Sequence, residues 1–469
     1  MTSRIAMKEM LEMCRDGRFQ VAAAIVGVLL AVSMGAGWMQ YRALRTEHET
    51  AQRAERVNWL TQARKNPHQG AHYGVYAFKP KSQLSMIDTG VDPYVGVAVY
   101  LEAHKQNEFK FRPAQDASTS IQRFGELTAA VVLQVLVPLL IILLTFAAFP
   151  GEREYGTLRQ VLSLGVSRRQ LTLGKAIGIA GALSAVLIPA TVAGVGTLAL
   201  NSGNELLSVD PSRTLLLMAA YAVYFAVFLA LSLTVSALAP TSRFALVALL
   251  AFWIVNGLIA TRAFSDLGGF LHPTASEVEF DASLQRDLAD TRDLDVKLDH
   301  IKNALFTQYH VHSLDDLPIN FRAISLQEAE EHGYRIFEQH FNGVFDQFDR
   351  QNAVYQLGGL VSPLIAVRSI SMGLAGTDFA HHRRFTVAAE NYRRTIVRYM
   401  DDDILVHPTR AGQEYMAGRE LWQKVPEFQY EAPGAGWALS HYRISMVLLA
   451  AWLFASIVGL TRAAERIAP

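Results

Sequence analysis

The chain is short of charged residues and almost without cysteine. Only 18% of its 469 residues are charged, compared with roughly 25% in average soluble domains, whereas 51% are hydrophobic. A soluble protein of this size is rarely so apolar, so we expect membrane spans. The single cysteine, Cys14, excludes an internal disulfide. Because the formal net charge is zero, no strongly basic surface is implied, and we expect no nucleic-acid partner.

The chain also lacks a nucleotide-binding loop and a relay of charges within the membrane. No G-x-x-x-x-G-K-[ST] pattern is present, and the stretch from Gly165 to Lys175 has the wrong spacing for one. The long apolar stretches contain almost no ionisable side chain at mid-depth, where the relays of ion-driven carriers are found. An ion-driven carrier is therefore disfavoured. We expect no cofactor and no enzymatic activity in this chain, and ATP with Mg²⁺ in a separate ATPase subunit.

Six apolar stretches are present, and each can cross the roughly 30 Å of a membrane's hydrocarbon layer. They predict spans over residues 19–41, 127–149, 171–200, 214–238, 244–263 and 441–461. The first is too long for a cleavable signal segment, so we expect it to remain as a span. Pro138 is expected to kink the second span and Pro189 the third.

These patterns predict a mainly α membrane protein with six transmembrane helices and two polar inserts. The expected segments are 1–41, with an amphipathic N-terminal helix and the first span; 42–125, a small insert of mixed α/β structure; 126–263, with spans two to five and a turn over 150–170; 264–440, a mostly helical insert; and 441–469, with the sixth span and a tail. In the second insert, we expect a helix over 283–305, a helix that begins with a capping box of Ser325 and Glu328, a helix over 378–404, and an extended segment over 422–433.

Basic residues are unevenly distributed among the short loops. The N-terminal segment, the turn over 150–170, Arg243 and the tail all carry positive charge, whereas the opposite short loop, 201–213, has only Arg213. Arginine and lysine in short loops favour the cytoplasmic side of a membrane. We therefore expect both termini in the cytoplasm and both inserts outside it.

The turn over 150–170 concentrates charge beside the membrane. Glu152 and Glu154 flank Arg153, and Gly156 permits a tight turn. We predict that the two carboxylates pair with basic groups of a partner and transmit its motion into the spans. The alternative is an ordinary solvated loop.

The wider stretch reads G-E-R-E-Y-G-T-L-R-Q-V-L-S-L-G-V-S-R-R-Q-L-x-L-G-K and resembles the cytoplasmic loop of ABC-2-type transporter permeases. The positions that carry the resemblance are Glu152, Gly156, Thr157, Leu158, Ser167, Arg168, Gly174 and Lys175. The expected ATPase-coupling residues are Glu152, Arg153, Glu154, Gly156, Thr157 and Leu158. We expect Arg168 and Arg169 to contact membrane lipid.

Motifs in both inserts resemble the DUF3526 subgroup of these permeases. They include Phe78-Lys79-Pro80, Asp316-Leu317-Pro318-Ile319-Asn320, Leu360-Val361-Ser362-Pro363, Glu390-Asn391-Tyr392-Arg393 and the segment from Trp422 to Pro433. The resemblance implies the permease subunit of an ATP-driven exporter in a bacterial inner membrane, with a cytoplasmic ABC ATPase and a second permease copy or paralogue as partners. The alternative is a mechanotransmission subunit that moves a periplasmic partner without passing cargo through its spans. A membrane-bound enzyme or receptor would need a site that the sequence does not contain.

Polar side chains within the spans are candidates for a pathway. They are Gln134, Tyr221, Tyr224 and Asn256. We predict that they line a route for cargo or a seam between two permeases. The alternative is hydrogen bonding between helices of one chain.

Histidine pairs are the candidates for metal ligands. They are His310 with His312, and His381 with His382. A zinc or copper site needs three or four converging ligands, and these histidines occur only in pairs. We therefore predict no metal site in this chain.

Overall fold

The computed structural model describes residues 1–107, 109–110, 127–201, 210–407 and 415–467; residues 111–125 of the predicted first insert lie outside these ranges. Helices dominate the described residues, which also contain one small sheet. The helices that are long and apolar enough to cross a membrane are Gly17–Leu60, Ala129–Glu154, Arg168–Leu198, Pro211–Leu238, Ser242–Leu271 and Arg443–Glu465. The predicted class, a mainly α protein with six membrane-crossing helices, is confirmed.

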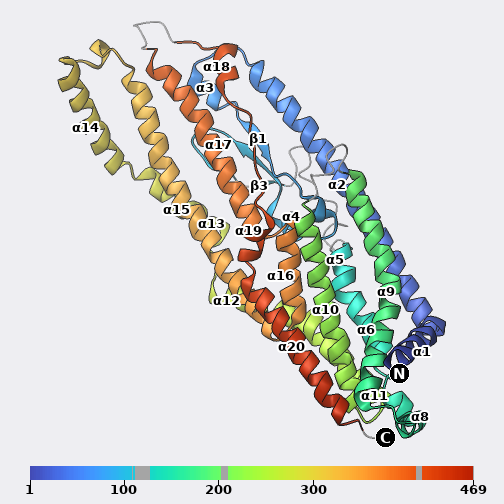
Figure 1. Ribbon diagram of the computed structural model, residues 1–469. Helices are drawn as coiled ribbons and strands as arrows, with labels where there is room; N and C mark the ends of the chain where they lie inside the picture. The colour runs from blue at the N-terminus through green and yellow to red at the C-terminus, as the bar shows by residue number, and fades with distance from the viewer. Residues whose placement is uncertain (108, 111–126, 202–209, 408–414, 468–469) are drawn as a thin grey trace.

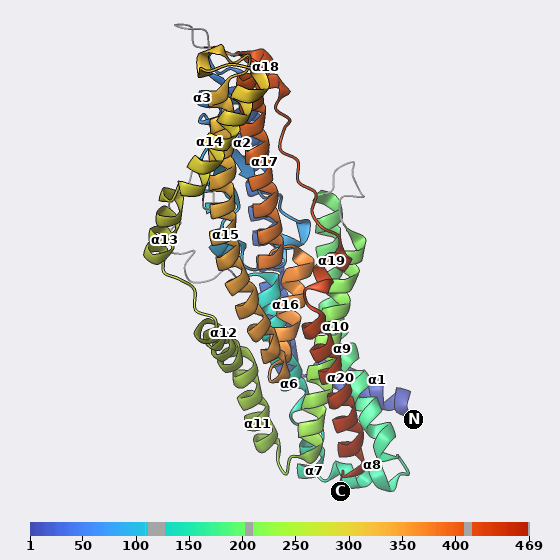
Figure 2. The ribbon, with the colours of Figure 1, turned by 90° about the vertical axis from the view of Figure 1, so that its left-hand side faces the viewer.

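The spans form one end of an elongated molecule, and the inserts project from the other end (Figure 1). The helices of the span region are α1 (Thr2–Arg15), α2 (Gly17–Leu60), α5 (Ala129–Val131), α6 (Val137–Thr145), α7 (Pro150–Glu154), α8 (Thr157–Ser163), α9 (Arg168–Asn201), α10 (Pro211–Leu238), α11 (Ser242–Ile254), α12 (Ala260–Leu271) and α20 (Arg443–Glu465). Both termini lie at the same end of the bundle, beside α7 and α8 (Figure 1 and Figure 2). We call this the terminal end.

Helix α2 connects the span region with the inserts. It has 44 residues, which at about 1.5 Å per residue makes it about 66 Å long. A span needs only about 20 residues, so the second half of α2 extends beyond the bundle (Figure 1). One continuous helix therefore connects the first span with the inserts.

Pro138 lies beside an irregular turn of the second span, and the kink predicted there stays a prediction. A five-residue π-helix, Val132–Leu136, stands between α5 and α6 and just before this proline. Proline has no N–H to donate to the carbonyl four residues earlier, which is that of Gln134. Tyr224 Oη donates to this carbonyl at 2.8 Å, and Trp253 Nε1 donates to the carbonyl of Val135 at 3.0 Å. Neighbouring helices thus satisfy the groups that the irregular turn releases.

The two inserts share one core. The elements of the first are α3 (Pro67–Ala71), β1 (Val75–Phe78), α4 (Asp92–Val95), β2 (Ala98–Leu101) and β3 (Phe109–Lys110), and its antiparallel sheet has the order β1-β2-β3. The elements of the second are α13 (Glu277–Ala289), α14 (Arg292–Tyr309), α15 (Phe321–Leu357), α16 (Pro363–Ala375), α17 (Phe379–Leu405), α18 (Arg419–Lys424) and α19 (Ala435–Ser440). Trp59 at the end of α2 donates to the carbonyl of Trp422 at 2.9 Å, and both indoles are buried in the common core.

Helix α16 is a buried part of the second insert. It packs against α10 and α20, two of the membrane-crossing helices. Pro363 occupies its first turn, where a missing N–H costs nothing, and Ser362 caps it by accepting from the N–H of Ile365. Nearly all of its side chains are buried, so α16 extends the core of the inserts into the span bundle.

Three sequence predictions for the second insert are wrong in detail. The expected helix over 283–305 is divided into α13 and α14, because the Asp290 carboxylate accepts from the N–H of Arg292 and competes with the helical bond. Ser325 does not start a helix, since α15 begins at Phe321 with Asn320 as its cap; the capping box is formed instead by Ser276 and Glu279. The segment over 422–433 is extended only after α18 ends at Lys424. The helix over 378–404 is confirmed as α17.

Candidate coupling site

The predicted turn over 150–170 folds as two short helices at the terminal end of the bundle. Helix α7 ends at Glu154 and α8 begins at Thr157, with Gly156 between them at φ 73°. Only glycine adopts this left-handed backbone conformation without a steric penalty. Thr157 Oγ1 donates to the carbonyl of Glu152 at 3.2 Å, which joins the two helices. We call residues 150–170 the coupling element.

Glu152 is directed into the protein. Lys175 Nζ, from α9, lies 2.7 Å from Glu152 and 2.8 Å from Glu9 of α1. The Lys175 side chain is only 2% exposed, that of Glu9 9% and that of Glu152 17%. The one ammonium group lies within ion-pair distance of both carboxylates, so it offsets part of their negative charge at a site that is largely shielded from water. The cluster therefore joins the coupling element, α1 and α9.

Glu154 and Arg153 connect the coupling element to the neighbouring short loop. Glu154 accepts hydrogen bonds from the N–H and hydroxyl of Ser242, at 2.7 and 2.9 Å, where α11 begins. Arg153 donates to the carbonyl of Ala239 at 2.9 Å. The two predicted partner-binding carboxylates thus have partners within the chain, although the residue Glu154 is still exposed. Their contact with an ATPase stays a prediction.

The coupling element also has its own small core. Leu158 is fully buried among apolar side chains from α9, α10 and the tail. Arg168 and Arg169 both contact Glu465, at 3.1 Å to its carbonyl and 2.7 Å to its carboxylate. The predicted lipid contact of these arginines is not tested, but 76% of the Arg169 side chain is exposed.

The exposed face of the coupling element has side chains that the sequence analysis did not select. Tyr155 is 87% exposed and Leu164 is 76% exposed. Both lie on an element whose inner side is fixed by the contacts described above. Tyr155 directly follows α7 and Leu164 directly follows α8, and nothing in their spacing indicated that both would face outward.

Three of the four predicted span residues meet in one buried network. Gln134 Nε2 donates to Tyr221 Oη at 3.0 Å, and Tyr224 donates to the Gln134 carbonyl as described above. Tyr221 Oη lies 3.0 Å from Ser371 Oγ of α16. Ser371 in turn donates to the carboxylate of Asp88 in the first insert. Burial raises the pKa of Asp88, so this carboxyl depends on such donors when it is ionised.

Asn256, the fourth of these residues, contacts the beginning of α16. Its Oδ1 accepts from Ser362 Oγ at 2.8 Å and from the N–H of Leu364 at 3.2 Å. The four residues therefore form hydrogen bonds between elements of one chain, which is the alternative raised by the sequence. Their role in a pathway or a dimer seam stays a prediction.

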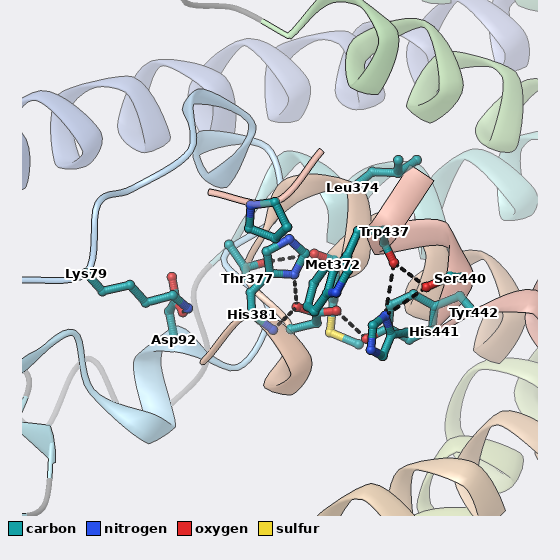
Figure 3. A network of polar contacts seen from close by, with 12 residues as sticks. Lys79, Asp92, Met372, Leu374, Thr377, His381, Trp437, Ser440, His441 and Tyr442 are labelled. Atoms are coloured by element: carbon teal, nitrogen blue, oxygen red, sulfur yellow. Dashed lines mark hydrogen bonds and ion pairs between the residues drawn. The ribbon is translucent and has the colours of Figure 1, made fainter. Parts of the chain in front are cut away.

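A second buried cluster connects the spans with α17 (Figure 3). Asp378, the cap of α17, accepts from Tyr442 Oη and pairs with His381 Nδ1. Arg213, at the beginning of α10, lies 3.2 Å from His381 Nε2 and donates to the carbonyl of Leu374 at 2.9 Å. Polar contacts thus continue from the spans into the inserts.

The predicted histidine pairs gather no further metal ligands within the ranges that the structure describes. His381 is bound to Asp378, while His310 ends α14 and His312 is exposed. A different group converges in the inserts and was missed: His68, His72 and His104. The His-x-x-x-His spacing of the first two was a signal, because residues four apart share a helical face. Nothing in the sequence indicated that His104 would join them.

A cavity of about 990 Å³ lies where α15 and α17 meet the segment before α20. Its lining includes Asp349, Asn352, Arg383, Arg384, Trp437 and His441. The lining is mixed in charge, with two arginines, one aspartate and one glutamate, Glu431. It is therefore suited to a polar or amphipathic molecule rather than to a purely apolar one.

Comparison with known families agrees with this geometry. A family model described as ABC-2 family transporter protein matches residues 3–285, more than half of the chain. The chain belongs to the ABC-2 transporter family. A second model, a domain of unknown function termed DUF3526, matches residues 277–431 of this ABC-2 chain. The search of curated proteins found no match for this chain.

The two matches divide the ABC-2 chain at α13. The first includes α1, the coupling element and five of the six membrane-crossing helices. The second includes α15, α16 and α17. The segment that matches the DUF3526 model therefore packs into the span bundle through α16. The predicted relationship to ABC-2 permeases with a DUF3526 segment is confirmed.

Proposed function

We propose that this chain is the permease subunit of an ATP-driven exporter and that the coupling element docks on a separate ATPase subunit. The observation that carries the proposal is the two-sided character of the coupling element. Its exposed side has Tyr155 and Leu164. Its inner side is bonded to α1 and α9 through Lys175, and to the beginning of α11 through Ser242. A push on such an element moves several helices together.

The orientation follows from the charge distribution. The terminal end carries most of the arginines of the short loops, so we place it in the cytoplasm, where ATP is available. The inserts then lie in the periplasm of a bacterium with two membranes, and the spans lie in its inner membrane. The family generally works with a partner ATPase, and we propose a second permease copy or a paralogue as the other partner.

Cysteine labelling tests this orientation. In a Cys14→Ser background, Tyr94→Cys and Val278→Cys place thiols at sites in the two inserts that are 80% and 78% exposed, and Leu164→Cys places one in the coupling element. We expect an impermeant reagent to label the first two in intact spheroplasts and the third only after lysis. Labelling of Leu164→Cys in intact spheroplasts would overturn the orientation.

Mechanotransmission is the second candidate function, and two observations favour it. The four polar span residues form hydrogen bonds with one another or with α16 and its cap. Their polar groups are therefore already engaged within the chain rather than directed towards a cargo molecule. The long helix α2 continues from the first span into the core of the inserts. In this version the ATPase moves the inserts. Their motion then acts on a periplasmic partner, or changes the shape of the cavity beside α17.

One experiment tests what both versions share, and a second separates them. The complex purified from its native membrane should contain an ATPase subunit, and its absence from an intact, monodisperse complex would contradict both versions. The same complex in sealed vesicles should move a co-purifying molecule across the membrane when ATP is supplied, if it is an exporter. ATP hydrolysis with a changed conformation of the inserts, but no transfer of that molecule, would favour mechanotransmission.

A further inference from the structure

Three histidines from two segments of the first insert converge at its border with the second. His68 lies in α3, His72 directly follows α3, and His104 follows β2. Each offers one ring nitrogen, and these nitrogens all lie within 4.8 Å of one another. The ring centroids are 4.7 to 5.1 Å apart. Zn–N bonds of about 2.0–2.1 Å place tetrahedral ligand nitrogens about 3.4 Å apart, so small ring rotations suffice to bring all three onto one ion.

Two buried carboxylates hold the outer nitrogens of this group. His104 Nδ1 pairs with Glu330 of α15, and His68 Nδ1 lies 3.4 Å from Asp401 of α17. The Glu330 and Asp401 side chains are only 3% and 1% exposed. The Nε2 atoms of His68 and His104 face each other at 2.9 Å. A carboxylate on Nδ1 that directs Nε2 towards a common centre is the usual support of metal-binding histidines.

The backbone also brings the third histidine to this place at a cost. His104 has φ 70°, and it is one of two non-glycine residues in the described ranges with a positive φ. Such a conformation is unfavourable for a residue with a Cβ and persists only where the surroundings impose it. Here it follows β2 and turns the imidazole towards α3.

We propose that His68, His72 and His104 bind one divalent transition-metal ion, of which Zn²⁺ is the best match, with an open fourth position. Imidazole nitrogens suit zinc, copper and nickel and not calcium or magnesium. His72 and His104 are exposed, so the ion is loaded from the solvent around the inserts. The proposal does not depend on export or on an ATPase.

The bound ion would connect elements that the chain places far apart. Its ligands belong to the first insert, and the carboxylates that orient them belong to α15 and α17 of the second. Metal loading therefore fixes the border between the inserts, near the end of α2. The site is a metal-dependent contact in the part of the molecule that the spans would move.

Zinc binding to the full-length chain tests the proposal. The protein is purified in detergent with a tag that contains no histidine, stripped with a chelator, and titrated with Zn²⁺ by calorimetry. We expect one ion per chain, and with Co²⁺ a visible absorption band of a tetrahedral site. His72→Ala removes an exposed ligand and should abolish both signals. The control His300→Asn/His312→Asn removes two exposed histidines of the second insert and should change neither.

The supporting carboxylates provide a second, graded test. Asp401→Asn keeps all three ligands and should weaken Zn²⁺ binding by about 10–100-fold, as losses of such partners do. Size-exclusion chromatography and circular dichroism establish that each variant is folded. If His72→Ala does not fold, His104→Gln provides the ligand test. Stoichiometric binding that survives loss of a ligand, or the absence of binding in the unaltered chain, overturns the proposal.

Discussion

At the residue scale, Lys175 is the most constrained charge of the terminal end. It is 2% exposed and lies between Glu9 and Glu152. Removing one member of a buried ion cluster leaves the remaining charge without compensation. This costs more stability than replacing the whole cluster by uncharged side chains. This ammonium group bonds the coupling element to α1 and α9 at once, beside the apolar contacts that Ile5 and Met13 make with the core of the element.

Replacement of Lys175 tests this dependence. We expect Lys175→Met to lower the free energy of unfolding by about 3–5 kcal/mol, because two carboxylates then remain close together without a counter-charge. The triple variant Glu9→Gln/Glu152→Gln/Lys175→Met removes all three charges and should recover most of the loss. Thermal melting in detergent measures both. Equal melting temperatures of Lys175→Met and the unaltered chain would refute the buried cluster.

His382 provides a pH-dependent test in the inserts. Burial, with a smaller contribution from Lys79, lowers its pKa to about 4 from an ordinary value of 6.5. Between these values the unfolded chain binds more protons than the folded chain, so stability rises with pH. Stability is therefore lost as pH falls from about 6.5 to about 4, by on the order of 3 kcal/mol from this group.

A melting series over that pH window measures the effect. His382→Gln should flatten the dependence, whereas His300→Asn, which replaces an exposed histidine of α14, should leave its slope unchanged. An identical slope in His382→Gln would show that the buried imidazole does not contribute.

The sequence indicated Glu152 and Glu154 as important residues but not their partners. Lys175 was visible as an isolated charge near the end of a span, and Glu9 as part of an amphipathic pattern. That all three meet depends on how α1, α7 and α9 pack, and no spacing rule applies to residues so far apart in the sequence. The same holds for His104, which reaches α3 only because β1 and β2 pair as they do.

At the element scale, the short helix α1 is held against α9 by glycines. A Cβ at Gly178 would lie 2.6 Å from the carbonyl oxygen of Ala6 and 2.7 Å from the Cβ of Glu9. The first of these atoms belongs to the backbone of α1 and the second is bonded directly to it, so neither can turn aside. Helix α1 would therefore have to move away from α9. Gly196, on the same helix, has no atom within 4 Å of such a Cβ.

These two glycines form a matched pair for experiment. We expect Gly178→Ala to displace α1 and to lower the melting temperature, since it also separates Glu9 from Lys175. Gly196→Ala should leave the melting temperature unchanged or raise it slightly, because alanine favours a helix. Limited proteolysis of the N-terminal helix provides a second readout. Equal protection of α1 in both variants would contradict the close packing.

Element types were predictable where one signal dominated. The long apolar runs predicted the membrane-crossing helices, and Pro138 predicted an irregular second span. Local competition was less predictable. Helix α13 ends just before Asp290, whose carboxylate accepts from the N–H of Arg292, although the apolar pattern continues past it. Ser325 matched a capping box but lies inside α15, because Asn320 starts the helix one turn earlier.

At the scale of the whole molecule, the contacts form a continuous route from the terminal end to the inserts. The coupling element is bonded to α1, α9 and α11; Gln134 and Tyr221 join two spans to α16; and α2 continues into the common core. Packed elements with few alternative arrangements transmit displacement over such distances. The insertion of α16 into the bundle was not predictable from the sequence, since its length and composition also fit a helix of the insert.

The central claim is that the exposed face of the coupling element receives force from an ATPase. The most direct measurement is the amount and activity of ATPase that co-purifies with Tyr155→Ala/Leu164→Ser. The control is Tyr94→Ala/Val278→Ser, which changes residues of comparable exposure in the inserts. We expect the first variant to fold and insert normally but to lose bound ATPase, and the second to retain it. Normal association and activity in Tyr155→Ala/Leu164→Ser would contradict the claim.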